Sequence, residues 1–265
     1  MRIDDTPLKS SLLLEAMRGR PRVLVYAFVL AHAVMMALAM LLAQASPPRE
    51  VIEALAIGRE TVLGTAYQAP FTGWVLRAVW WLGDGELWPV VLVGAIADAV
   101  GLWAVFQLSR SIVGYRQGAV ATGLLAGVAW VTWLLPAPDP NRLLLALFPL
   151  TALHLWRAAG RGRRLYWILV AIDVAMLVMT RYAAVVLVGV LIAAMLLSAK
   201  GRAAFRKPEP YGAALLAILL LAPHLTWLAA RPTFPLTATG VDLTALLAPW
   251  GKTMLLALVG HLGLV

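Results

Sequence analysis

Carboxylate and cationic side chains interrupt this apolar chain at a few polar connections, and they are of the types that act on phosphorylated substrates. The stretch Pro-Asp-Pro-Asn-Arg (138–142) places Asp139 between two prolines. Prolines at positions 136, 138 and 140 prevent a helix from continuing and keep the backbone in an extended turn. The simplest interpretation of Asp139 alone is a polar turn between two membrane spans.

A second group of polar residues lies in the connection that follows the first apolar segment. A further pair of polar residues is expected, from the topology, on the same membrane face. In the earlier connection, Glu50 and Glu53 precede a helical piece, Arg59 follows it, and Tyr67 and Gln68 lead into an apolar helix. The further pair is Arg181 and Tyr182. On one membrane face, an arginine could hold a phosphate and an acid could deprotonate a hydroxyl. A solvated loop surface predicts the same residue types, so spacing alone leaves both interpretations open.

The composition predicts the elements that must position these residues. Of the 265 residues, 62% are hydrophobic and 13% are charged, whereas soluble domains are about 25% charged. The chain has no cysteine, which excludes disulfides and thiolate metal sites. It also lacks the Gly-rich phosphate loops, HExxH and GxSxG motifs of soluble enzymes. We therefore expect an all-α fold, a polytopic transmembrane helix bundle that forms a single domain over residues 1–265.

The net charge of +9 is distributed in a way that indicates a membrane protein and excludes a nucleic-acid role. Most of the basic residues cluster near the N-terminus and in the stretches 110–116, 157–164 and 200–207. Acidic residues occupy the connections between these clusters. This alternation follows the positive-inside rule and predicts a multi-pass protein whose N-terminus is cytoplasmic.

A helix needs about 20 apolar residues to cross the hydrocarbon core of a membrane. Seven spans and part of an eighth are predicted at 23–45, 87–108, 118–135, 143–156, 165–180, 183–198, 211–229 and, incompletely, 252–265. The tryptophan-rich stretch 70–83 contains Arg77, which favours a helix lying along the membrane interface within the first external loop. The predicted external loops are 46–86, 136–142 and 231–250.

Two acids fall within the predicted spans, Asp98 in the second and Asp173 in the fifth. An unpaired charge near mid-bilayer costs about 2.5–3.5 kcal/mol, so each acid must face the bundle interior or be neutral. Packing hydrogen bonds and a transport or proton-relay role both fit. His154 and His224 lie near span ends, and neither has a second metal ligand at helical spacing.

Four stretches, in order, carry a resemblance to a known family. They are EVIEALAIGRETVLGTAYQAPFTGWVL (50–76), APDPNRLLLALFPLTALHLWRA (137–158), LVMTRYAAVVLV (177–188) and APHLTWLAARPTFP (222–235). Together they resemble the GT-C class of membrane glycosyltransferases. In particular, they are similar to glycosyltransferase family 39, which includes protein mannosyltransferases and lipid A aminoarabinose transferases.

The resemblance implies an inverting enzyme that moves a sugar from a polyprenyl phosphate to an acceptor on the outer membrane face. By position, Glu50 falls on the first-loop acid of the family and Asp139 on the second-loop acid; these would be the catalytic residues. Arg181 stands where a lysine is usual and would bind the donor phosphate with Tyr182 and Arg59. The resemblance further implies support from Glu53, Tyr67 and Gln68, a lipid-linked sugar donor and membrane lipids as partners, and the bacterial inner (plasma) membrane as location.

The chain departs from the family pattern at several of these positions. The usual Asp-Glu is Glu50-Val51, and the lysine and first proline before the interfacial helix are Gln68 and Ala69. Family members also continue for several further spans, so a fragment or a shortened relative is expected. No cofactor is implied with certainty, and a divalent metal is left open.

Two further functions remain open from the residues alone. One is a non-catalytic GT-C-like accessory subunit of a larger membrane complex, with other membrane proteins as partners. The other is a small-molecule transporter that uses Asp98 and Asp173, although the sequence lacks the internal repeats that such folds often show.

Overall fold

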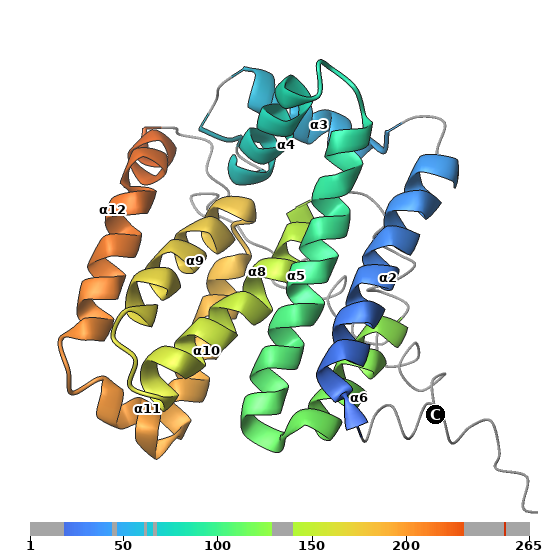
Figure 1. Cartoon of the computed structure of the whole chain (residues 1–265). Coiled ribbons are helices and arrows are strands. Elements are labelled where there is room, and N and C mark those ends of the chain that lie inside the picture. The colour runs from blue at the N-terminus through green and yellow to red at the C-terminus, as the bar shows by residue number, and fades with distance from the viewer. Residues whose placement is uncertain are drawn as a thin grey trace, which may run out of the picture. The chain divides into compact units, whose positions relative to one another are not determined.

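The computed structural model describes residues 19–43, 47–60, 63–65, 68–128, 140–230 and Lys252. Every regular element within these ranges is a helix, which confirms the all-α fold class. Residues 1–225 form one compact unit and residues 226–265 form a second. The arrangement described below is that of the first unit (Figure 1).

Four helices in the described ranges are long and apolar enough to cross a membrane. They are α2 (Pro21–Ala43), α5 (Trp88–Val113), α8 (Pro140–Leu155) with its π-helical continuation η1 (Trp156–Gly160), and α12 (Glu209–Ala229). The predicted spans 165–180 and 183–198 form α9 (Tyr166–Thr180) and α10 (Ala184–Leu197), with 15 and 14 residues. These two helices are therefore shorter than a full span of about 20 residues.

The other predicted spans are described in part. The predicted span 118–135 begins as α6 (Tyr115–Gly127), and residues 129–139 lie outside the described ranges. The expected incomplete span 252–265 lies outside them except for Lys252. A short helix, α11 (Ala199–Ala204), connects α10 to α12.

The first connection between spans contains two helices, α3 (Arg49–Arg59) and α4 (Phe71–Leu82). Helix α4 corresponds closely to the helix predicted at 70–83. The two helices cross at Gly58 and Gly73, where a Cβ added to Gly58 would lie 2.2 Å from the Gly73 carbonyl oxygen. Figure 1 shows both helices at one end of the bundle, beyond the start of α5.

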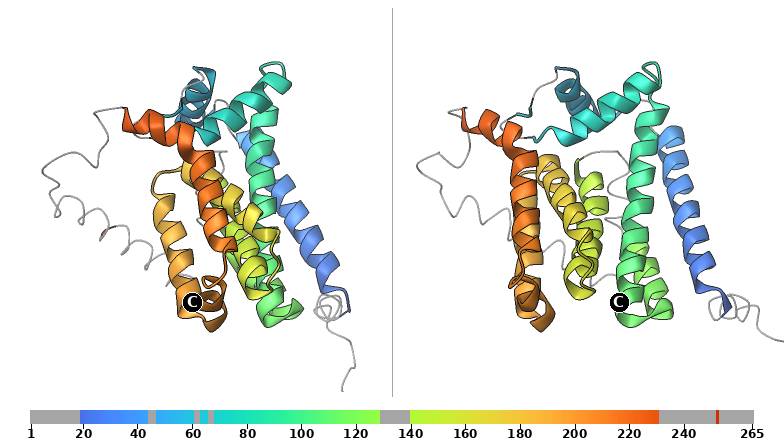
Figure 2. Two further views of the ribbon diagram at one scale, coloured as in Figure 1. Left: turned by 90° about the vertical axis from the view of Figure 1, so that its left-hand side faces the viewer. Right: turned by 60° about the vertical axis from the view of Figure 1, so that its left-hand side comes forward.

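The basic connections lie at the other end of the bundle. The end of α5, η1 and α11 gather there, and both views in Figure 2 keep them opposite α3 and α4. This segregation agrees with the alternation of charge along the sequence. The identity of the cytoplasmic end stays a prediction from the positive-inside rule.

Helix α5 lies at the centre of the packing, against α2, α6 and α8, and α8 packs in turn against α9. The closest approach of α5 to α8 occurs at Gly101, where an added Cβ would lie 2.6 Å from the carbonyl oxygen of Leu145. Only glycine permits two helix backbones to come this close. The contact fixes the register of the two helices and so aligns Asp98 with Arg142, one turn before each contact residue.

Candidate active site at the α3–α4 end

Three segments that are distant in the sequence meet around Tyr182, in the turn between α9 and α10. The Tyr182 hydroxyl donates a hydrogen bond to the Thr65 carbonyl oxygen at 2.8 Å. Its ring stacks on that of His224, with centroids 5.7 Å apart and planes inclined by 12°. The Nδ1 atom of His224 lies 2.7 Å from the Leu63 carbonyl oxygen. Tyr182 and His224 therefore hold the segment that leads into α4 against α9 and α12.

This environment affects the ionisation of Tyr182. The side chain is partly buried, and desolvation raises the pKa of the Tyr182 phenol above its ordinary value. The neutral phenol is the form that can donate to Thr65. Burial and the hydrogen bond consequently favour the same protonation state.

Arg181 is placed by the end of α9. The residue is in an extended conformation at the C-cap, with φ −156° and ψ 131°, so its side chain leaves the helix axis. Its guanidinium donates a hydrogen bond to the Asn141 side-chain oxygen at the start of α8. Asn141 is two residues after Asp139 in the chain, although Asp139 itself lies outside the described residues. The contact brings a solvent-exposed cation to a residue two positions after the predicted acid in the chain.

A buried ion pair lies directly behind this contact. Arg142 approaches Asp98 with Nη2 2.8 Å from Oδ2, and each side chain is only 1% exposed. Arg142 is the largest fully buried side chain among the described residues. An arginine is retained in an apolar interior only when a partner compensates its charge. Asp98 therefore anchors the first turn of α8, which carries Asn141.

The acids of the first connection lie elsewhere. Glu50 is in the first turn of α3 and Glu53 lies further along the same helix, so the expectation that they precede a helix was wrong. The reason is that Pro48 immediately before Arg49 starts the helix earlier than the apolar pattern indicates. Glu53 pairs with Arg49 at 2.7 Å, and this hydrogen bond is the main cause that raises the pKa of Arg49.

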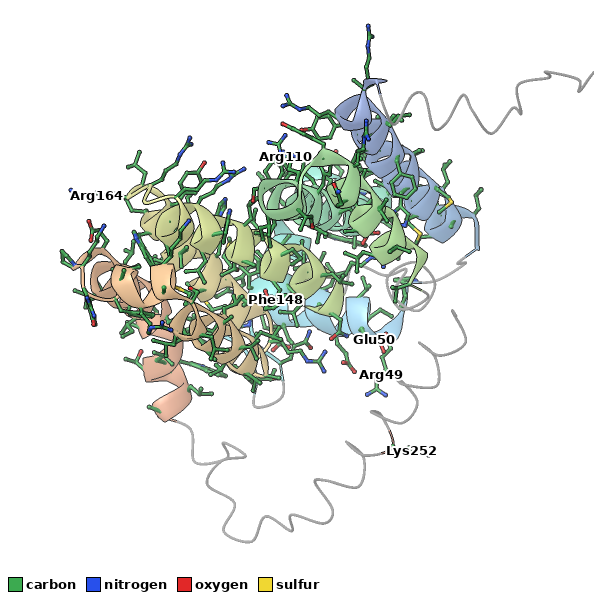
Figure 3. All side chains as sticks on the ribbon, turned by 90° about the horizontal axis from the view of Figure 1, so that it is seen from below. Arg49, Glu50, Arg110, Phe148, Arg164 and Lys252 are labelled. Carbon is green, nitrogen blue, oxygen red and sulfur yellow. The ribbon has the colours of Figure 1, made fainter. Side chains whose placement is uncertain are left out.

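Glu50 makes no contact with Arg181 or Asn141 in the described structure. Its side chain and that of Arg49 point away from the helices in Figure 3. Of the two predicted catalytic acids, Asp139 is the one near in the chain to Asn141, which Arg181 contacts. Glu50 is exposed to solvent, and it interacts electrostatically with Arg49 at the start of the same helix.

Arg59 lines a different part of the same end of the bundle. Together with Arg77 it borders a cavity of about 910 Å³ between α3 and α4. The remaining lining is Ile52, Leu55, Ala56, Trp80, Trp81, Leu82, Asp84 and Gly85. The lining includes neither Arg181 nor Tyr182, so Arg59 is not brought into their group.

Gln68 contributes to the site through its backbone. The Gln68 N–H donates to the Thr65 hydroxyl at 3.0 Å, and its carbonyl oxygen accepts from the Thr65 N–H at 2.8 Å. These bonds close the turn against which Tyr182 docks. Tyr67, the other predicted support residue, lies outside the described ranges.

The second intramembrane acid also has a buried partner. Asp173 Oδ2 lies 2.6 Å from His154 Nδ1, across the contact between α8 and α9. Both acids within the spans are thus paired between helices, which supports their interpretation as packing groups. In the part of the chain that the structure describes, no three His, Cys, Asp or Glu side chains lie close enough to hold a metal ion.

Several of these contacts could not be found from the sequence. The pairing of Asp98 with Arg142 and the docking of Tyr182 on Thr65 depend on the register between helices, which no local pattern encodes. His224 could have been found from its place in the fourth stretch of the resemblance. Asn141 is two residues after Asp139, but nothing in its spacing indicates that it would accept a bond from Arg181.

In the described residues, the apolar helices and the polar groups at one end define an all-α membrane bundle. The chain matches the family described as dolichyl-phosphate-mannose-protein mannosyltransferase over residues 67–227. This match covers more than half of the chain, and the chain belongs to that family. It also confirms the resemblance to glycosyltransferase family 39. No curated protein matches the chain in a direct sequence comparison.

Proposed function

We propose that the protein transfers a sugar from a polyprenyl-phosphate donor to an acceptor hydroxyl, with inversion at the anomeric carbon. The reaction takes place at the α3–α4 end of the bundle, on the outer face of a bacterial inner membrane. The observation that carries the proposal is the contact between Arg181 and Asn141. It joins the cation that stands at the usual lysine position of the family with a residue two positions after Asp139 in the chain.

Arg181 binds the phosphate of the donor in this proposal. The guanidinium is exposed and reaches the donor from the end of α9, while its bond to Asn141 limits its rotation. Charge-assisted hydrogen bonds to phosphate are about twice as strong as neutral ones. Tyr182 positions Arg181 by fixing the turn between α9 and α10 to Thr65.

Asp139 is the favoured general base, and Glu50 is the second candidate. A base must approach the acceptor hydroxyl while the donor phosphate is bound nearby. The position of Asp139, two residues before the partner of Arg181, supports this role. Glu50 is exposed to solvent in the first turn of α3, which suits an acid that meets a mobile acceptor.

Donor binding by the purified protein tests the role of Arg181. A short-chain polyprenyl-phosphate-mannose serves as the probe. Arg181→Ala should weaken its binding by about 10- to 100-fold, as expected for loss of a hydrogen bond to a charged group. Arg181→Lys should restore part of the affinity, and Arg206→Ala, an exposed arginine at the other end of the bundle, serves as the control. Equal affinity of wild type and Arg181→Ala would contradict the proposal.

Transfer in membrane vesicles tests the two acids. Asp139→Asn should reduce mannose transfer by about 10²–10⁴-fold with donor binding unchanged, because a general base acts on the chemical step. Glu50→Gln should have the smaller effect. Wild-type protein that binds the probe but transfers nothing under any condition would favour the accessory-subunit function.

A further inference from the structure

A second polar cavity lies at the basic end of the bundle, far along α5 from the candidate active site. Its volume is about 280 Å³. The lining residues come from the end of α5, the start of α6 and η1: Gln107, Arg110, Ser111, Tyr115, Trp156, Arg157 and Arg161. Figure 3 looks onto this end of the molecule and labels Arg110. We call this the arginine cavity.

The positive charge of the arginine cavity is not balanced by carboxylates. The ion pairs found in the described ranges are Arg49–Glu53, Arg142–Asp98, His154–Asp173 and Arg164–Glu209. None of them involves Arg110, Arg157 or Arg161. Arg110 and Arg157 instead donate to the hydroxyls of Tyr115 and Tyr166, both at 3.3 Å. These neutral partners orient the two guanidinium groups and leave their charges available to an anion.

The π-helical turn explains how Arg161 reaches the cavity. In η1 the Arg161 N–H bonds to the Trp156 carbonyl oxygen, five residues back, at 3.2 Å. An α-helix turns 100° per residue, so residues five apart would face directions about 140° apart. At this wider turn, Arg161 and Trp156 line the same cavity. Trp156 lines the cavity, and its buried indole N–H has no hydrogen-bond partner among the described residues.

An apolar cleft adjoins the arginine cavity and shares Trp156 with it. Its volume is about 260 Å³. The walls are mostly small or aliphatic side chains of α5, α8, η1 and α10, among them Leu108, Ile112, Leu155, Leu191 and Ala194. Ser198, Lys200 and Gly201, at the start of α11, form its end. Leu108 and Ile112 directly follow Gln107 and Ser111 of the arginine cavity on α5. The two cavities thus adjoin at Trp156, with arginines on one side of it and an apolar groove on the other.

We propose that these two adjoining cavities bind one anionic membrane phospholipid. The arginine cavity takes the phosphate and the negative headgroup, and the apolar cleft takes an acyl chain. Basic pockets at the ends of transmembrane helices have the charge that such headgroups require, and tryptophan suits the boundary between a polar and an apolar environment. The site lies at the opposite end of α5 from the α3–α4 end and does not depend on the proposed glycosyl transfer.

The apolar cleft is what selects a lipid over a soluble anion. A free phosphate would use only the basic side chains of the two cavities and would gain nothing from the aliphatic walls of α5 and α10. A phospholipid at the membrane surface fills both parts at once. The charge of the arginine cavity further selects an anionic headgroup over a zwitterionic one.

Native mass spectrometry of the full chain in detergent, titrated with phosphatidylglycerol or phosphatidylcholine, tests the headgroup. Phosphatidylglycerol should bind more tightly than phosphatidylcholine. Arg161→Gln should weaken phosphatidylglycerol binding about fivefold, corresponding to about 1 kcal/mol for one basic residue near the membrane. Arg206→Gln is the matched control, because Arg206 is an exposed arginine at the same end that lines neither cavity. Equal weakening by the two variants, or equal binding of the two lipids, would overturn the proposal.

A second pair of variants tests the acyl-chain cleft without a change of charge. Ala194→Phe places a ring in the cleft, whereas Ala193→Phe places one on an exposed neighbouring position that does not line it. Ala194→Phe should reduce phosphatidylglycerol binding and Ala193→Phe should not. If the two variants bind equally, or if inorganic phosphate displaces phosphatidylglycerol completely, the site takes a free anion and the lipid assignment fails.

Discussion

At the scale of single residues, Arg142 is the clearest case of a charged side chain held in the interior by an ion pair. Its guanidinium is buried between α5 and α8, and Asp98 supplies the compensating charge. The position of Asn141 in the candidate active site also depends on this ion pair, because Asn141 precedes Arg142 in the first turn of α8. A change at Asp98 should therefore affect stability first and donor binding as a consequence.

Asp98→Asn should lower the free energy of unfolding by about 3–5 kcal/mol, since it removes the negative charge that Asp98 places 2.8 Å from the buried guanidinium of Arg142. The double variant Asp98→Leu/Arg142→Met should recover most of this loss, because neither charge remains. Thermal unfolding in detergent, followed by circular dichroism, measures both. Asp84→Asn, at an exposed turn, is the control, and a double variant no more stable than the single one would contradict a specific pair.

The raised pKa of Tyr182 gives a prediction about alkaline pH. The neutral phenol of Tyr182 donates a hydrogen bond to Thr65 and so stabilises the folded state. Because the pKa of Tyr182 is raised in the folded state, this contribution to stability is complete below a pH of about 10. It is lost as the pH rises through the raised value. Tyr182→Phe keeps the stacking on His224 and should cost about 1 kcal/mol at neutral pH.

Unfolding of the two proteins across alkaline pH tests this. The stability difference between wild type and Tyr182→Phe should shrink as Tyr182 ionises. His224→Phe should show the full alkaline loss, because the hydroxyl of Tyr182 is retained. A difference that is constant with pH would exclude the bond from Tyr182 to Thr65.

At the scale of elements, glycine decides how closely α5 and α8 pack. Gly101→Ala places a methyl group 2.6 Å from the Leu145 carbonyl oxygen, so the helices must separate at a cost of about 1–3 kcal/mol. Gly123→Ala, within α6, meets nothing within 4 Å and should stabilise the protein by up to about 1 kcal/mol. Thermal unfolding of the two variants should thus give shifts of opposite sign. Shifts of the same sign would contradict the close approach at Gly101.

The sequence predicted most helices because apolar composition and proline positions are local properties. The interfacial helix at 70–83 and the spans at 23–45 and 87–108 agree with α4, α2 and α5 to within a few residues, except for the longer end of α5. The predicted start of α3 was wrong because the apolar pattern begins several residues after Pro48, which directly precedes the helix. The site was harder to predict, because the partners of Asp98 and Tyr182 lie on other helices and depend on helix register.

At the scale of the whole molecule, the alternation of charge predicts which loops face outward. The chain has no cysteine, so single cysteines at Glu86, Arg163 and Arg206 can report their location. In intact cells, an impermeant thiol reagent should label Glu86→Cys and leave Arg163→Cys and Arg206→Cys unmodified. Permeabilised cells, in which all three should react, provide the control. Labelling of Arg163→Cys from outside would reverse the proposed orientation.

The π-helical turn after α8 has a consequence for how the arginine cavity could be lost during evolution. A turn closed by a bond five residues back holds one residue more than an α-helical turn, and such turns occur often at functional positions. Deletion of Ala159 would convert the turn to α-helix without removing any arginine, yet it would rotate Arg161 away from Trp156. In a lineage, therefore, the loss of one alanine codon could abolish the lipid site while every charged residue that builds it remained.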